Sequence, residues 1–101
     1  MQIDKNLLNV VCNISKVADL NSLFEELFTS AELSDLNLRW KLMKELHSGV
    51  PQRKIAEKYG ISLCKITRGS KVLKKQNSSV LKILNELTSG KSKYTAPKKE
   101  K

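Results

Sequence analysis

The sequence predicts an all-α protein built as one domain. Its 101 residues with 40% apolar content suffice for one small core. Apolar residues recur at intervals of three and four over most of residues 4–89, and no stretch shows the alternation of a strand. We expect a single helical domain at 1–90 and a disordered Lys-rich tail at 91–101, which carries no apolar stripe. So short a chain buries a modest share of its surface, and its stability is marginal unless helices of a second copy complete the core, so an obligate oligomer is plausible.

Two helices are predicted in the first quarter of the chain. Residues 4–18 form an amphipathic pattern that Asp4 opens as N-cap. Residues 21–28, "NSLFEELF", repeat the pattern over a shorter length. The apolar positions of the first helix are Leu7, Leu8, Val10, Val11, Ile14 and Val17.

A long helix follows. "TSAE" at 29–32 has the form of a capping box, with Thr29 and Glu32 each bonding the other's amide, and Gly49 is suited to the position just after the helix. The helix carries two apolar faces, so we expect it in the centre of the fold or between two subunits. One face holds Leu33, Leu36, Trp40 and Met43, and the other Leu38, Leu42 and Leu46.

The stretch "QRKIAEKYGISLCKITRGS", residues 52–70, predicts a helix-turn-helix at about 51–73, made of helices at 51–59 and 62–73. Ala56 is small where the second helix crosses the first, and Gly60 permits a positive φ in the turn. Ser62 is expected to cap the second helix through the amide of Lys65. The core of this corner should hold Ile55, Tyr59, Ile61 and Ile66.

A sixth helix is predicted at 79–89. Its stripe is formed by Val80, Ile83, Leu84 and Leu87, and it should end at Gly90.

Positive charge is concentrated on the corner and the tail. The net charge is +9, yet residues 1–48 hold five basic and seven acidic residues, whereas residues 49–75 hold eight and one. Such a corner favours a polyanionic partner. The plainer alternatives are lysines that are merely solvated and a helix pair that meets only for packing.

Several classes of protein find no support in the sequence. No apolar run is long enough to span a membrane, and polar residues interrupt the first twenty positions, so we expect a cytoplasmic protein. Cys12 and Cys64 are expected to be reduced thiols, and with His47 they give no metal spacing. With one histidine and no nucleophile arrangement or phosphate-cradling loop, no enzymatic activity is predicted.

If the corner binds double-stranded DNA, the exposed start of its second helix enters the major groove. That side carries mostly residues that make weak direct hydrogen bonds to bases, so specificity would depend on Arg53, thymine methyl contacts, water and DNA shape. The lysines are better placed for phosphates. The candidate DNA-binding residues are Gln52, Arg53, Lys54, Leu63, Cys64, Lys65, Thr67, Lys71 and Lys74, with Lys58 and Lys75 as further phosphate contacts.

The segments "LFEELFTSAELSDLNLRWKLMKELHSG" and "KITRGSKVLK" resemble the bacterial tryptophan repressor family over about residues 23–75. "ITRGS" at 66–70 is the most specific part. The resemblance implies a six-helix intertwined homodimer that binds a palindromic operator. It also implies L-tryptophan as corepressor, with no other cofactor and no membrane partner.

The resemblance also implies ligand-binding residues. In the family the indole lies between two arginines, which match Arg39 and Arg68, and Gly69 matches a glycine that leaves room beside it. A guanidinium stacks on flat rings and binds carboxylates, so the chemistry is suitable. The ammonium is held by carbonyls at the end of a short helix, here the backbone from Glu26 and Leu27 to Thr29.

This chain departs from the family pattern at two places near the site. Val72 replaces a serine beside the ligand amine, and the loop between Gly49 and Gln52 is one residue shorter. The alternative for Arg39 is an ion pair with Asp35 at i−4, and for Arg68 a plain phosphate contact.

The leading hypothesis is an L-tryptophan-dependent transcriptional repressor that controls genes of tryptophan metabolism or uptake. A second keeps the DNA without the ligand, as in helix-turn-helix modules of transposases or sigma factors. A third is a helical adaptor whose basic surface meets an acidic protein.

Overall fold

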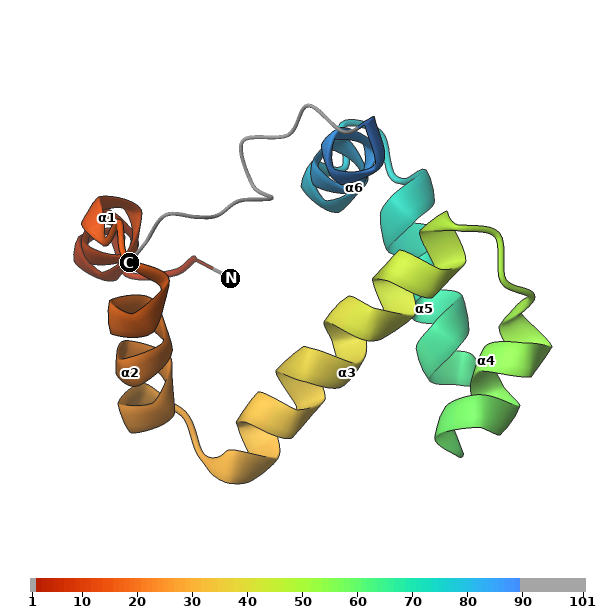
Figure 1. Ribbon diagram of the computed structural model, residues 1–101. Helices are drawn as coiled ribbons and strands as arrows, with labels where there is room; N and C mark the ends of the chain where they lie inside the picture. Colours follow the sequence, from red (N-terminus) through yellow and green to blue (C-terminus); the bar gives the residue numbers. More distant parts are fainter. Residues whose placement is uncertain (1, 90–101) are drawn as a thin grey trace.

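The structure, a computed structural model, describes residues 2–89 and within them holds six helices and no strand (Figure 1). This confirms the all-α prediction. The predicted tail and the helix end at Gly90 lie outside the described residues. The helices are α1 Lys5–Asn13, α2 Val17–Leu27, α3 Ser30–His47, α4 Gln52–Tyr59, α5 Leu63–Lys74 and α6 Ser79–Ser89.

The division of the first 28 residues was predicted wrongly. In place of helices at 4–18 and 21–28, α1 ends at Asn13 and α2 begins at Val17. Asn13 donates its side-chain amide to the Asn9 carbonyl over 2.7 Å, and Ile14 and Lys16 are extended. Apolar residues continue through this break with helical spacing, so periodicity alone does not reveal it. Asp4 caps α1 as expected, accepting from the Leu7 amide over 3.1 Å.

Helix α3 begins and ends as its sequence signals predict. The Thr29 hydroxyl accepts from the Glu32 amide over 3.1 Å, and Glu32 accepts from the Thr29 amide over 2.9 Å. At the other end Gly49 has φ +95°, its amide donates to Leu46, and the Val50 amide donates to Glu45. This pair of bonds is a Schellman motif, which turns the chain sharply towards α4.

Helix α3 is the central element, since α2, α4, α5 and α6 all pack against it (Figure 1). Leu42, Ile55 and Ile66, from α3, α4 and α5, form the buried core where these helices meet. Leu38, Leu46, Ala56, Tyr59 and Ile61 surround them, which confirms the predicted core of the corner and one apolar face of α3.

A polar cluster also ties α4 to α3. Glu45 on α3 accepts a hydrogen bond from Lys58 over 2.8 Å and another from the Tyr59 hydroxyl. Lys58 forms an ion pair with the same carboxylate, and its ammonium lies 5.3 Å from the Tyr59 ring centroid. The hydrogen bonds from Lys58 and then Tyr59 lower the pKa of Glu45. The bond to Glu45 raises the pKa of Lys58 and that of Tyr59.

Helix α6 packs against α3, and a hydrogen bond joins it to the C-terminal end of α3. Its buried Leu84 lies within the predicted stripe, and the Ser78 hydroxyl caps the helix by accepting from the Leu81 amide over 3.1 Å. His47 Nε2 and Asn85 Oδ1 share a hydrogen bond of 2.8 Å, which joins α6 to the end of α3.

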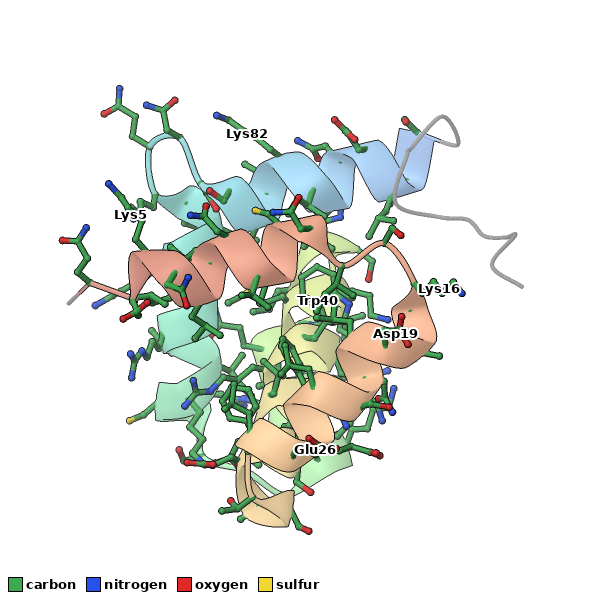
Figure 2. All side chains as sticks on the ribbon, turned by 90° about the vertical axis from the view of Figure 1, so that its left-hand side faces the viewer. Lys5, Lys16, Asp19, Glu26, Trp40 and Lys82 are labelled. Atoms are coloured by element: carbon green, nitrogen blue, oxygen red, sulfur yellow. The ribbon has the colours of Figure 1, made fainter. Side chains whose placement is uncertain are left out.

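Helices α1 and α2 extend from the rest of the chain and contain no buried residue (Figure 1). Figure 2, which looks from their side, shows Trp40 of α3 behind them. Large apolar side chains remain exposed on α1, α2 and this side of α3, so one chain leaves them uncovered. They include Leu8, Val10, Val17, Leu27, Phe28, Leu36 and Trp40. None of the helices described at 2–89 has the length and apolar character needed to cross a membrane.

Replacement of Ile66 by alanine should destabilise the protein by about 2–5 kcal/mol, because its side chain is fully buried between three helices. Leu63→Ala on the same helix is the control: Leu63 is 46% exposed, so a change of roughly 0.5 kcal/mol is expected there. Chemical unfolding followed by Trp40 fluorescence measures both. Equal losses would contradict the assigned core.

The Glu45 cluster predicts a pH-dependent stability difference. Because the pKa of Glu45 is lowered on folding, its contribution is present at neutral pH and lost as pH falls through the folded-state pKa, below the ordinary carboxyl value. Since the pKa of Lys58 is raised, its contribution is lost as pH rises through the folded-state value, above that of a free lysine. Glu45→Gln should therefore be less stable than wild type near neutrality and converge with it in acid.

Chemical unfolding at a series of pH values measures this difference. Glu57→Gln, which removes an exposed carboxylate from α4, is the matched control and should show no such convergence. A Glu45→Gln difference that persists unchanged in acid would contradict the assignment.

Candidate functional site

The corner formed by α4 and α5 is a helix-turn-helix. Gly60 ends α4 in the left-handed conformation with φ +62°, and the Ile61 amide donates to the Ala56 carbonyl over 3.2 Å. The predicted Ser62 cap is corrected: Ser62 stands at the N-cap position of α5, but its side chain makes no capping hydrogen bond. The first amides of an exposed helix can be satisfied by solvent, so the fold does not require the cap. Pro51 likewise gives α4 no side-chain cap.

The predicted DNA-binding residues lie at the starts of α4 and α5 and along α5. All are exposed except Gln52, which is half-buried. The Thr67 hydroxyl donates to the Gln52 side-chain oxygen over 3.2 Å, so one bond connects the start of α4 with the middle of α5. Leu63, Cys64 and Lys65 form the first turn of α5, and Lys71 and Lys74 lie in its last turn.

A pocket of about 290 Å³ lies between α3 and α5. This is close to the lower end of the roughly 300–1,000 Å³ that small-molecule sites occupy. It is lined from α3 by Asp35, Leu38, Arg39, Leu42 and Met43, and from α5 by Lys65, Arg68, Gly69 and Val72.

The pocket has an apolar floor and a charged rim. Leu42 and Gly69 are buried, and Leu38, Met43 and Val72 are half-buried. The exposed members are Asp35, Arg39, Lys65 and Arg68, which place three cations and one anion around the opening. Such a pocket suits a small molecule with a flat apolar body and a head group that carries a carboxylate.

Gly69 allows α5 to approach α3. A Cβ atom at this position would lie 3.2 Å from Leu46 Cδ1 and 3.6 Å from Met43 Cε. The helices therefore meet closely beside the pocket. Gly69 itself lines the pocket. Its role beside a ligand stays a prediction of the sequence resemblance.

The two arginines that the resemblance assigns to the ligand line one pocket. Arg39 on α3 and Arg68 on α5 line the same pocket from its two walls. The alternative ion pair between Arg39 and Asp35, both within the described residues 2–89, is not formed. A guanidinium on each wall can face a flat ring from both sides.

The structure does not bring Glu26, Leu27 and Thr29 to the pocket of their own chain. They lie at the junction of α2 and α3, at the opposite end of α3 from its connection to α4 (Figure 1). Thr29 also uses its hydroxyl and its carbonyl at the start of α3, accepting from Glu32 and Leu33.

Sequence reasoning missed several members of the pocket. Asp35 was considered only as a partner of Arg39, and Lys65 only as a DNA contact, yet both line the pocket. A helical signal was available, because Asp35 stands four residues before Arg39 and Lys65 three before Arg68. Leu38 and Leu42 were assigned only to an apolar face of the long helix, and they line the pocket too.

Other kinds of site find no support within residues 2–89. Cys12 and Cys64 are free and exposed. Across the described part of the chain, no three His, Cys, Asp or Glu side chains gather in a way that could hold a metal ion.

The all-helical fold and the corner of α4 and α5 together define a helix-turn-helix protein. The family model described as Trp repressor protein matches residues 3–88, a longer stretch than the segments that carried the sequence resemblance. The chain belongs to this Trp repressor family and is a regulator of that type.

Two relatives illustrate the range of the family. A Trp operon repressor homolog of Chlamydia trachomatis serovar D is 38% identical over 68 residues, which cover 66% of this chain and 72% of that protein. A Trp operon repressor homolog of Xylella fastidiosa strain M23 is 33% identical over 72 residues, 70% of this chain and 78% of that protein. No solved structure is matched significantly.

Proposed function

We propose that this protein is a transcriptional repressor that uses L-tryptophan as corepressor and acts in the cytoplasm on genes of tryptophan metabolism or uptake. The observation that carries the proposal is the pocket between α3 and α5, in which Arg39 and Arg68 occupy opposite walls above an apolar floor. An indole would stack between the guanidinium groups, and the ligand carboxylate would pair with the cations of the rim.

Operator binding is assigned to the corner. The first turn of α5, with Leu63, Cys64 and Lys65, would face the bases, and Thr67 follows one turn later. Arg53 and Lys54 at the start of α4 and Lys71 and Lys74 at the end of α5 would contact phosphates. Since α5 offers few strong hydrogen-bonding groups for base edges, shape and bridging water would carry much of the specificity.

We infer a homodimer for two reasons. The exposed apolar side chains of α1, α2 and α3 need a cover that one chain does not supply. The end of α2 does not line its own pocket, so the contact of Glu26 and Leu27 with a ligand ammonium requires the α2 of a second copy. Within residues 2–89 no hydrogen bond occupies the carbonyls of Glu26 and Leu27, and these carbonyls form the negative end of a helix dipole.

Ligand control follows from the position of α5, which is at once a wall of the pocket and the helix that would enter the groove. A ligand between α3 and α5 would fix the distance and tilt of α5 on each subunit. Helix-turn-helix dimers, the Trp repressor among them, bind half-sites about 34 Å apart, so this tilt decides whether both helices fit. By linkage, operator would tighten tryptophan binding by the same factor.

Operator affinity should rise with L-tryptophan, by roughly 5- to 150-fold if the coupling is of the usual size. Arg39→Ala should abolish this rise while leaving the ligand-free affinity unchanged, because Arg39 lies in the pocket and not on the corner. Titration of a labelled operator at fixed salt, with and without L-tryptophan, measures both. Equal affinities for the wild-type protein would favour the ligand-independent helix-turn-helix module.

Lys74→Gln should weaken DNA binding to all sequences and reduce the slope of log affinity against log salt by about 0.9 for each phosphate that the variant no longer neutralises. Lys16→Gln is the matched control, since Figure 2 shows Lys16 at the start of α2, away from the corner. Binding to operator and random duplex over a salt series measures the slopes. Unchanged slopes would place Lys74 outside the interface, and equal affinity for both duplexes would favour the helical adaptor.

A further inference from the structure

Asp35 is the anionic member of a pocket whose other charged residues are cations. It lies on α3, one turn before Arg39, and shares the pocket with Lys65 and Arg68 of α5. An acid four residues before a base on a helix is well placed for an ion pair. Nevertheless, no ion pair joins Asp35 to Arg39, Lys65 or Arg68, all of which belong to the described chain.

The charge of the rim affects which of two ligands binds better, one with a carboxylate alone or one with both a carboxylate and an ammonium. Three cations and one anion leave the opening with a net positive charge. A positive opening attracts a monoanion more strongly than a zwitterion, whose own charges cancel. Loss of Asp35 would make the opening more positive still and would favour a des-amino acid such as indole-3-propionate over an amino acid with the same ring.

No other side chain of the pocket can offset this preference. The remaining members are apolar or cationic, and Val72 has no hydrogen-bonding group. A ligand ammonium can therefore find an anionic partner among the lining side chains at Asp35. A carboxylate and an ammonium form a charge-assisted hydrogen bond, which is stronger than one between neutral groups.

We propose that Asp35 is a specificity-determining residue that binds the ammonium group of the ligand and thereby selects an α-amino acid over its des-amino analogue. This inference rests on the proposed function, because it concerns the same pocket. The ligand ammonium would then have two kinds of partner: Asp35 of the same chain and the α2 carbonyls of a second copy. The bond to Asp35 would replace the hydrogen bond that a hydroxyl at position 72 would make and that Val72 does not offer.

The test compares the affinities of two ligands, L-tryptophan and indole-3-propionate, by calorimetric titration of the full chain at low, fixed ionic strength. Asp35→Asn should weaken the binding of L-tryptophan about tenfold, since the ammonium loses its partner. It should strengthen the binding of indole-3-propionate about threefold, since the opening becomes more positive. Asp35→Glu, which retains the charge, should keep the wild-type order of preference.

Asp19→Asn is the matched control for net charge. Figure 2 shows Asp19 on α2, and it does not line the pocket, so both affinities should stay at the wild-type values. Circular dichroism and thermal unfolding establish that each variant is folded.

The outcomes separate the two proposals. A parallel weakening of the binding of both ligands in Asp35→Asn would overturn the inference, since it would mean that Asp35 does not distinguish a ligand with an ammonium group from one without it. Unchanged affinities would overturn it as well, and in both cases the wild-type binding of L-tryptophan would leave the proposed function standing. A wild-type protein that binds neither ligand would overturn the proposed function together with this inference.

Discussion

The contact between α3 and α5 at Gly69 is the constraint on which the rest of the structure depends. A side chain at this position would press on Leu46 and Met43, so the absence of one sets how near the two helices lie. At this separation Ile66 reaches Leu42 and Ile55, and α4 is held against both helices by the same small core. The pocket lies beside the contact, so core, corner and pocket all follow from one close approach of two backbones.

Within residues 2–89 an ion pair joins α3 to α4, whereas the charged side chains around the pocket form none. Between α3 and α4, Glu45 accepts hydrogen bonds from Lys58 and Tyr59 and so connects the corner to α3. Around the pocket, in contrast, Arg39, Lys65 and Arg68 have no carboxylate paired with them within residues 2–89. Unpaired cations that face one another repel, and an anionic group brought between them relieves that repulsion. The proposed ligand and the proposed operator both supply such groups.

Much of the fold was predictable because its signals are local. The capping box at Thr29 and Glu32 and the positive φ at Gly49 and Gly60 each depend on neighbours within a few residues. The break after Asn13 was missed, since apolar periodicity continues across it. The pocket was predicted in part. Arg39, Arg68 and Gly69 came from family resemblance, whereas Asp35 and Lys65 required the crossing of α3 and α5, which spacing along either helix does not specify.

Because α5 carries both pocket residues and candidate DNA contacts, its two roles are expected to evolve together. Lys65, Arg68 and Gly69 line the pocket, while Leu63, Cys64 and Thr67 alternate with them along the same twelve-residue helix. In the proposed repressor, a mutation that adapts the helix to another effector molecule would therefore also change its footprint on the double helix, and the converse would hold. Metabolite preference and promoter choice would then be inherited together, whereas a substitution on α3, such as one at Asp35, would alter the first while sparing the second.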